Sequence, residues 1–271
     1  MSVILGIDLG GTKLAYGFYV EGEIVEQNVQ PTERDFPAQL HALYTRGRRG
    51  FGTIDSVAIG VPGPVSGATM GDSAPLNFTG SYCFSDCFPG SQALFVKNDV
   101  YMALIAEIQL GAGRVFQDFV LVSISTGIGV GVALRGRPLD IRTEMGHQKL
   151  RLNEVNDRPC INHSGCWASI CSGAALADPD QALEAEQVKK ANTYAFANLA
   201  AAYDPSAIVL MGGVGLNRFE ELIPNQESLA QHVMSKPTTQ ILKSELGPQI
   251  GVYGAIRLAE DQIKRARTDR G

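Results

Sequence analysis

Three glycine-rich turns, each directly after an apolar run, are the segments of this sequence best suited to binding an anion. They read Asp8-Leu-Gly-Gly-Thr-Lys13, Ser125-Thr-Gly-Ile-Gly-Val-Gly131 and Gly212-Gly-Val-Gly215. Glycines let backbone amides approach an anion closely, and Thr12, Lys13 and Thr126 add side-chain donors. Turns that follow strands are also where α/β folds place their ligands. The three turns together predict a nucleotide held between two similar halves of the chain.

Two common nucleotide motifs are excluded by spacing. Gly6 and Gly11 have the separation of a P-loop, but Thr12-Lys13 reverses the usual order of lysine and hydroxyl residue. The turn also opens a strand, whereas a P-loop opens a helix. The glycines of Ser125–Gly131 alternate with single residues and therefore lack the dinucleotide fingerprint.

Asp99 is the residue best placed for acid–base chemistry. It follows Asn98 at the end of a short apolar run, and the next residues, 100–110, have helical spacing. A carboxylate there could accept a proton from a substrate hydroxyl, or it could cap the helix. The residues alone leave both roles open, and one does not exclude the other.

The elements that must position these residues alternate between strand and helix, which indicates an α/β fold. A strand–glycine turn–strand unit begins at residue 3 and recurs at residue 119, so the pattern predicts duplicated domains. Further strands are expected at 93–97, at 206–211 and within 56–64, where the strand ends in a rigid loop, and helices at 38–48, 100–110, 182–203 and 252–267.

Composition narrows the class of protein. Of 271 residues, 45% are hydrophobic and 19% are charged, which is the balance of a globular chain. A net charge of -5 gives no electrostatic footprint for nucleic acid, and no run of eighteen apolar residues exists to cross a membrane. No signal peptide is recognisable, and five cysteines are an odd number. We therefore expect a cytoplasmic protein whose cysteines are free thiols or metal ligands.

Six motifs in order resemble those of the ROK family (repressors, open reading frames and sugar kinases), in the superfamily of hexokinase, actin and the Hsp70 ATPases. The resemblance covers essentially the whole chain. The motifs are Asp8–Lys13, Gly60-Val-Pro-Gly-Pro-Val65, Asn98-Asp99, Ser125–Gly129, Glu144-Met-Gly-His147 and Gly212-Gly-Val214.

This resemblance implies two actin-like (ribonuclease H-like) α/β domains with an interdomain cleft. The first is expected at 1–113 with the terminal helix 252–267, and the second at 114–251. The implied activity is ATP-dependent transfer of phosphate to the 6-hydroxyl of a hexose or N-acetylhexosamine, with Mg²⁺, in a homodimer. Repressors of the family carry an N-terminal helix-turn-helix, for which Asp8 leaves no room, so the enzyme is favoured.

The resemblance also implies roles for individual residues. Asp99 would be the catalytic base, and the sugar would be bound by Asn77, Asn98, Glu144 and His147. The nucleotide and its Mg²⁺ would be held by Asp8, Gly10, Gly11, Thr12, Lys13, Thr126, Gly127, Gly129, Gly212 and Gly213.

One segment departs from the family pattern. The usual Cys-x-Cys-Gly-x-x-Gly-Cys-x-Glu is here Cys160-Ile-Asn-His-Ser-Gly-Cys-Trp-Ala168, which lacks the middle cysteine and the closing glutamate. His163 could replace the missing thiolate, so that His147, Cys160, His163 and Cys166 would form a closed Cys₂His₂ zinc shell. The alternative is a loop with two free thiols and a surface histidine.

Ala168 removes the family's acidic contact near the anomeric end of the sugar. Two other functions therefore stay open: a catalytically weak, sugar-sensing regulator of the same fold, and an ATPase that acts with a protein partner.

Overall fold

The computed structural model describes residues 2–141, 144–150, 160, 163–178, 183–233 and 238–268. The chain forms two compact units, Met1–Glu107 with Leu246–Gly271, and Ile108–Glu245. Within the described residues, no helix is both long and apolar enough to span a bilayer.

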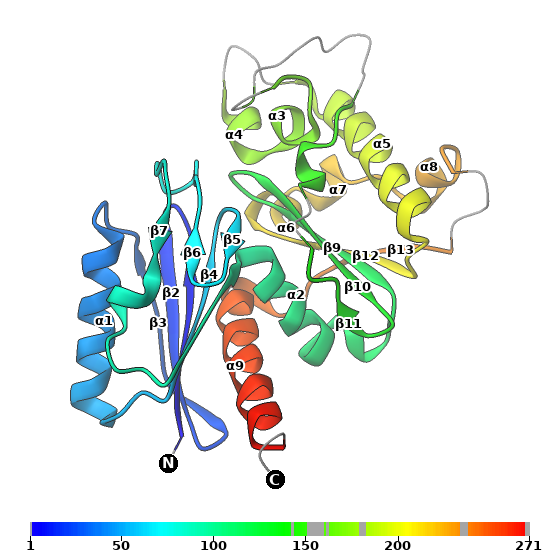
Figure 1. Cartoon of the computed structure of the whole chain (residues 1–271). Coiled ribbons are helices and arrows are strands. Elements are labelled where there is room, and N and C mark those ends of the chain that lie inside the picture. Colours follow the sequence, from blue (N-terminus) through cyan, green and yellow to red (C-terminus); the bar gives the residue numbers. More distant parts are fainter. Residues whose placement is uncertain are drawn as a thin grey trace. The chain divides into compact units, whose positions relative to one another are not determined.

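The first unit is built on a five-stranded sheet of order β3-β2-β1-β4-β8 (Figure 1). Its elements are β1 (Val3–Leu9), β2 (Lys13–Val20), β3 (Glu23–Pro31), α1 (Phe36–Phe51), β4 (Ser56–Val61), β8 (Ala93–Asn98), α2 (Asp99–Leu110) and α9 (Ile250–Thr268). A small sheet of three two-residue strands, β5 (Val65–Ser66), β6 (Thr69–Met70) and β7 (Tyr82–Cys83), lies between β4 and β8 in the chain and precedes a 3₁₀ turn, Phe84–Cys87.

Side-chain alternation along β1 divides the core of the first unit into two layers. Val3, Leu5, Ile7 and Leu9 pack with the apolar residues of α1. Ile4, on the other face, packs with α2 and α9. Figure 1 shows α1 and α9 on opposite sides of this sheet. Because successive side chains of a strand point to opposite faces, Asp8 shares the α9 face with Ile4.

The second unit repeats this design around a sheet of order β11-β10-β9-β12-β13. Its strands are β9 (Phe119–Ile124), β10 (Ile128–Leu134), β11 (Arg137–Pro138), β12 (Ala207–Met211) and β13 (Gln240–Lys243). Its helices are α3 (Trp167–Cys171), α4 (Gly173–Ala177), α5 (Ala185–Tyr203), α6 (Gly213–Asn217), α7 (Phe219–Leu222) and α8 (Gln226–Ala230), with 3₁₀ turns at Ala112–Arg114 and Met145–His147; a further 3₁₀ turn, Gly247–Gln249, precedes α9 in the first unit.

The two sheets have the same topology. In each, the first three strands form an antiparallel meander, and two later strands add in parallel beside the first. The predicted repeat of the strand–turn–strand unit is therefore confirmed. The parallel additions bring the carboxyl ends of β1, β4 and β8 to one edge, as in the second unit for β9, β12 and β13.

A buried polar chain fixes three helices in the core of the second unit. The indole Nε1–H of Trp167 donates to Asn192 Oδ1 at 2.7 Å, and Asn192 Nδ2 donates to the carbonyl of Leu222 at 2.7 Å. Trp167 and Asn192 are almost wholly buried. Since water cannot reach these groups, each depends on the other for a partner.

We predict that Asn192→Ala lowers the free energy of unfolding by about 2–4 kcal/mol, because it leaves a buried indole N–H and a buried carbonyl unpaired. Asn198→Ala, an exposed position on the same helix, should cost under about 1 kcal/mol. Urea unfolding followed by fluorescence of Trp167, the single tryptophan, measures both. Equal losses in the two variants would contradict this account.

Candidate functional site

Two carboxylates meet at the sheet edge of the first unit. Asp8 lies near the carboxyl end of β1, and Asp99 begins α2 directly after β8. The Asp8 carboxylate packs against Gly251 in the first turn of α9, where an added Cβ would come within 3.0 Å of three Asp8 side-chain atoms. Any larger residue at 251 would displace the carboxylate, so this close approach requires glycine.

Burial and charge both act on Asp8. Desolvation by the surrounding protein is the larger cause and the negative charge of Asp99 the smaller, and together they raise the pKa of Asp8 to about 7. The residue as a whole keeps some accessible surface. The charge of Asp99 disfavours the ionised form of Asp8, and a cation at this position would be attracted by both carboxylates.

Asn98 and Asp99 share the helix cap. The N–H of Val100 donates to Asn98 Oδ1 and to Asp99 Oδ1, each at 2.9 Å. Asn98 Nδ2 also donates to the carbonyl of Gly63 at 3.3 Å, which ties α2 to the Gly60–Val65 motif. The helix cap, one of the two roles that the sequence leaves open for Asp99, is thus divided between Asn98 and Asp99. The amide group of Asn98 has a second Nδ2 hydrogen besides the one that Gly63 accepts.

The first glycine turn lies at the same edge. Gly10 N–H donates to the carbonyl of Lys13 at 2.9 Å and closes the turn, which leaves Thr12 and Lys13 exposed. Gly11 packs against the hairpin that carries Asn77, a residue that is exposed and has a φ of 50°. The structure therefore brings together the predicted residues of the first unit, from the glycine turn to Asp99.

In the second unit, the other two glycine turns are neighbours. Thr126 and Gly127 connect β9 and β10 and are exposed. The backbone of α4 holds this turn, since Gly173 N–H donates to the carbonyl of Ser125 at 2.6 Å and Ala174 N–H to that of Thr126 at 3.2 Å. Gly212 packs on the carbonyl of Ile124, at the end of β9, and Gly213 begins α6.

The Glu144–His147 segment packs on the start of β10. A Cβ at Gly146 would meet the carbonyl of Ile128, the residue that follows the Thr126–Gly127 turn by one position. Glu144 is exposed, and its carbonyl accepts the N–H of His147 at 2.8 Å. Of the predicted residues in this unit, Gly129 also lies in β10.

Four nitrogen and sulfur ligands converge beside this segment. Ligand atoms of His147, Cys160, His163 and Cys166 all lie within 4.8 Å of one another. The His147 Nδ1 atom is 3.4 Å from Cys160 Sγ and 3.6 Å from Cys166 Sγ. An antiparallel β-bridge joins Lys149 to Cys166, and Cys160 N–H donates to the carbonyl of His163. These contacts hold the backbone near the four ligands. These donors are of the types that bind zinc.

Some contacts at these sites could not be read from the sequence. No sequence motif marks Gly251, because it is one small residue in a terminal helix. The carbonyl of Gly63, which accepts from Asn98, lies in the Gly60–Val65 motif, but the motif does not say which atom is used.

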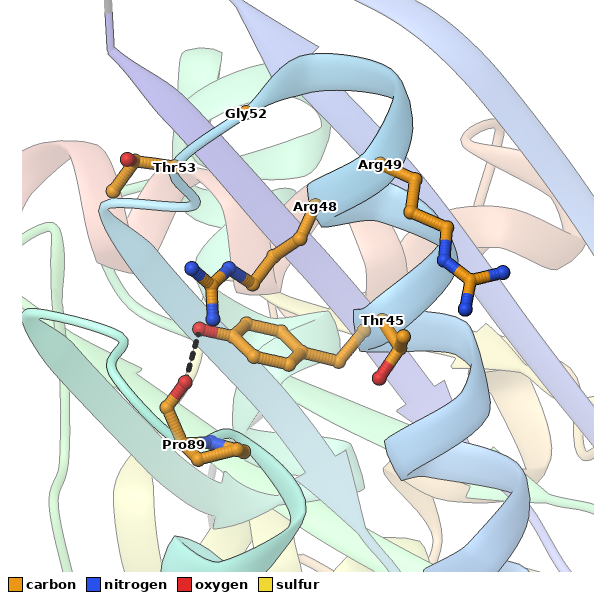
Figure 2. Close-up of a pocket in the computed structure, with 7 residues that line it drawn as sticks. Thr45, Arg48, Arg49, Gly52, Thr53 and Pro89 are labelled. Carbon is orange, nitrogen blue, oxygen red and sulfur yellow. Dashed lines mark hydrogen bonds between the residues drawn. The ribbon is translucent and has the colours of Figure 1, made fainter.

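A cavity of about 400 Å³ opens at the end of α1, away from the predicted residues, none of which lines it. Tyr44 OH donates to the carbonyl of Pro89 at 3.0 Å within it. Figure 2 shows Arg48 and Arg49 pointing apart from the last turn of α1. Guanidinium groups that diverge cannot both bind one anion. Basic residues in the last turn of a helix are explained by their favourable interaction with the helix dipole. We therefore assign this cavity no role.

The raised pKa of Asp8 predicts a pH-dependent stability. The folded state binds the Asp8 proton more tightly than the unfolded state, whose pKa is near 3.8. This group therefore costs stability as pH rises from about 4 to 8. Without Mg²⁺ or nucleotide, Asp8→Asn should match the wild type near pH 4 and exceed it by about 2 kcal/mol at pH 8, a figure reduced for partial exposure.

Urea unfolding across this pH range measures the difference, and Asp86→Asn, an exposed carboxyl of the same unit, controls for loss of one charge. A gap that is constant with pH would contradict the assignment.

Comparisons with known proteins agree with this arrangement. The family model described as "ROK family" matches residues 4–195. An N-acetylmannosamine kinase from Haemophilus influenzae is 26% identical over 96% of each chain. A glucokinase from Streptomyces coelicolor is 24% identical over 96% of this chain and 98% of its own.

Solved structures show the same fold. The ROK hexokinase from Thermus thermophilus has a TM-score of 0.76 at 24% identity and covers 97% of this chain and 99% of its own. A ROK transcriptional regulator, a homologue of the E. coli MLC protein, has a TM-score of 0.74 at 19% identity, over 95% of this chain and 78% of its own. The predicted fold of two actin-like α/β domains is confirmed. With the family model covering most of its length, this chain belongs to the ROK family.

Proposed function

We propose that this protein is an ATP-dependent sugar kinase that phosphorylates the 6-hydroxyl of a hexose or N-acetylhexosamine. The observation that carries the proposal is the Asp8–Asp99 pair at the sheet edge of the first unit, in a chain whose relatives at about 25% identity are named sugar kinases. Phosphoryl transfer requires a base for the hydroxyl proton and a cation for the phosphates, and the two carboxylates suit these two tasks.

Asp99 is the base in this proposal. Its carboxylate accepts the proton of the sugar hydroxyl as the oxygen attacks the γ-phosphate. Asn98 binds the sugar beside it through the Nδ2 hydrogen that does not reach Gly63, and Asn77 binds another hydroxyl. Because Asn98 is fixed by Val100 and Gly63, it can hold the hydroxyl close to Asp99 with little reorganisation.

Asp8 would hold Mg²⁺ through water, as suits an ion that keeps much of its hydration shell. When bound, Mg²⁺ would neutralise phosphate charge, and its positive charge would also favour the ionised form of Asp8. The glycine turn Gly10–Lys13 contributes backbone amides and the side chains of Thr12 and Lys13 to the phosphates.

The second unit supplies the other ligands. Thr126, Gly127 and Gly129 donate to phosphates, and Gly212 and Gly213 lie against adenosine. Glu144 and His147 bind sugar hydroxyls. These residues are exposed or partly exposed in the structure, so each is accessible to a ligand.

We also propose a structural zinc ion at His147, Cys160, His163 and Cys166. In a tetrahedral site with ordinary bond lengths, nitrogen and sulfur ligands are about 3.6 Å apart. The distances of 3.4 and 3.6 Å from His147 Nδ1 to the two sulfurs fit this value. If Nδ1 faces the metal, Nε2 is left to bind the sugar, so zinc would fix the orientation of a substrate ligand.

Ala168 bears on which sugar the protein binds. Ala168, in α3, is buried and provides no acidic group. The anomeric end of the sugar therefore lacks a charge-assisted partner at this position. This departure, with the regulator among similar structures, supports a second candidate function: a sugar-sensing protein with weak catalysis.

The kinase proposal predicts sugar-dependent ADP release from Mg·ATP, measured across a panel of hexoses and N-acetylhexosamines. Asp99→Asn should lower kcat by at least about 100-fold with little change in sugar affinity, because only proton transfer is lost. If well-folded protein binds a sugar without releasing ADP, the sensing function replaces the kinase.

The zinc proposal predicts one zinc ion per chain by metal analysis of the purified protein. Cys160→Ser should lose the metal and raise the sugar KM several-fold, because His147 is no longer held in place. Cys83→Ser, which removes an exposed thiol outside the cluster, should keep both the metal and the KM. Metal-free protein with an unchanged sugar KM would contradict the proposed role.

A further inference from the structure

Gly11 lies directly against the hairpin that carries Asn77. A Cβ added at Gly11 would be 2.8 Å from the carbonyl carbon of Pro75, 3.0 Å from its Cβ, and closer still to its carbonyl oxygen. A Cβ cannot lie so close to atoms to which it is not bonded. The backbone of the first glycine turn and the backbone of the hairpin are therefore in contact, and only a residue without a side chain permits it.

The hairpin is too tightly closed to absorb a displacement of Pro75 alone. Ser73 and Phe78 exchange two backbone hydrogen bonds, at 2.9 and 3.0 Å, and Asn77 N–H donates to the carbonyl of Ala74 at 3.0 Å. Asn77 itself has a left-handed φ of 50°. With the base of the hairpin fixed, a push on Pro75 moves the tip, and Asn77 lies in that tip.

Hydrogen bonds also fix the position of the glycine turn. The hydroxyl of Thr32 donates to the carbonyl of Gly10 at 2.6 Å, and Thr32 N–H donates to the carbonyl of Thr12 at 3.1 Å. Gly10 N–H closes the turn onto Lys13. Thr32, the residue after β3, thus holds the turn that contacts the hairpin.

We propose that Gly11 is a positioning residue for the sugar: its backbone sets the place of Pro75, and through it the place of the Asn77 side chain. This inference rests on the proposed function, in which the turn binds phosphate and Asn77 binds sugar. It adds a mechanical link between the two, so that the nucleotide turn supports sugar binding even before nucleotide is present.

The test compares Gly11→Ala with a matched change in the same turn. A Cβ at Gly10 would approach only the carbonyl of Lys13, at 3.0 Å, and not the hairpin. Calorimetry without nucleotide measures the Kd of the sugar that the panel identifies. Gly11→Ala should weaken sugar binding about 10-fold, the loss of about one hydrogen bond, whereas Gly10→Ala should stay within about 2-fold.

A double-mutant cycle shows whether Gly11 acts through Asn77. In an Asn77→Ala background, Gly11→Ala should weaken the sugar no further, because the side chain that it positions is already gone. At saturating substrates, Gly11→Ala should raise the sugar KM far more than it lowers kcat. Additive losses in the cycle, or equal losses in Gly10→Ala and Gly11→Ala, would overturn the inference.

Wild-type protein that binds no sugar would contradict the proposed function instead. The contact would then be tested by NMR of the ligand-free protein. Displaced Asn77 amide resonances in Gly11→Ala but not in Gly10→Ala would support the link, and unmoved resonances in both would refute it.

Discussion

The crowding of the Asp8 carboxylate is the constraint on which the first unit depends. The carboxylate lies at the end of a buried strand, packs on Gly251 of α9 and faces the charge of Asp99. This arrangement is unfavourable by itself, because burial and the like charge of Asp99 both oppose ionisation of the Asp8 carboxyl. In the proposed kinase, Mg²⁺ beside the phosphates would supply the positive charge that offsets this cost.

Other features of the unit maintain this arrangement. Alternation along β1 turns Asp8 toward α9, while its neighbours Ile7 and Leu9 fill the opposite core. The terminal helix returns to the first sheet and supplies the small residue that the carboxylate needs. Asn98 fixes the start of α2 and therefore the position of Asp99. The contacts that stabilise this unit and the residues of the proposed active site thus lie at one edge of the sheet.

Much of this could be predicted from sequence, because the signals are local. The strand–turn–strand units at 3 and 119 predicted two similar sheets, and the cysteines and histidines at 147, 160, 163 and 166 predicted a cluster that the structure brings together. The small sheet β5-β6-β7 could not be predicted, because strands of two residues are too short to show an alternation of apolar and polar residues.

The contacts that were missed join distant parts of the chain. Gly251 meets Asp8, and Gly11 meets Pro75, only because the sheet folds them together. A glycine in sequence indicates a turn or nothing, and the atom that a side chain would strike is known only from the tertiary structure. The division of the helix cap between Asn98 and Asp99 is a local contact, but the sequence does not show which of two adjacent polar side chains accepts the N–H of Val100.

The most direct test of the central claim is the titration of Asp8 by ¹³C NMR, with Asp8→Asn to assign its carboxyl signal. In the ligand-free protein, the account predicts a pKa of about 7. Addition of Mg²⁺ with a non-hydrolysable ATP analogue should lower it well below that value, because a nearby cation favours the carboxylate. A pKa near 4 in the free protein, or one that Mg²⁺ and nucleotide leave unchanged, would contradict the view that this carboxylate pair is the metal-binding and catalytic centre.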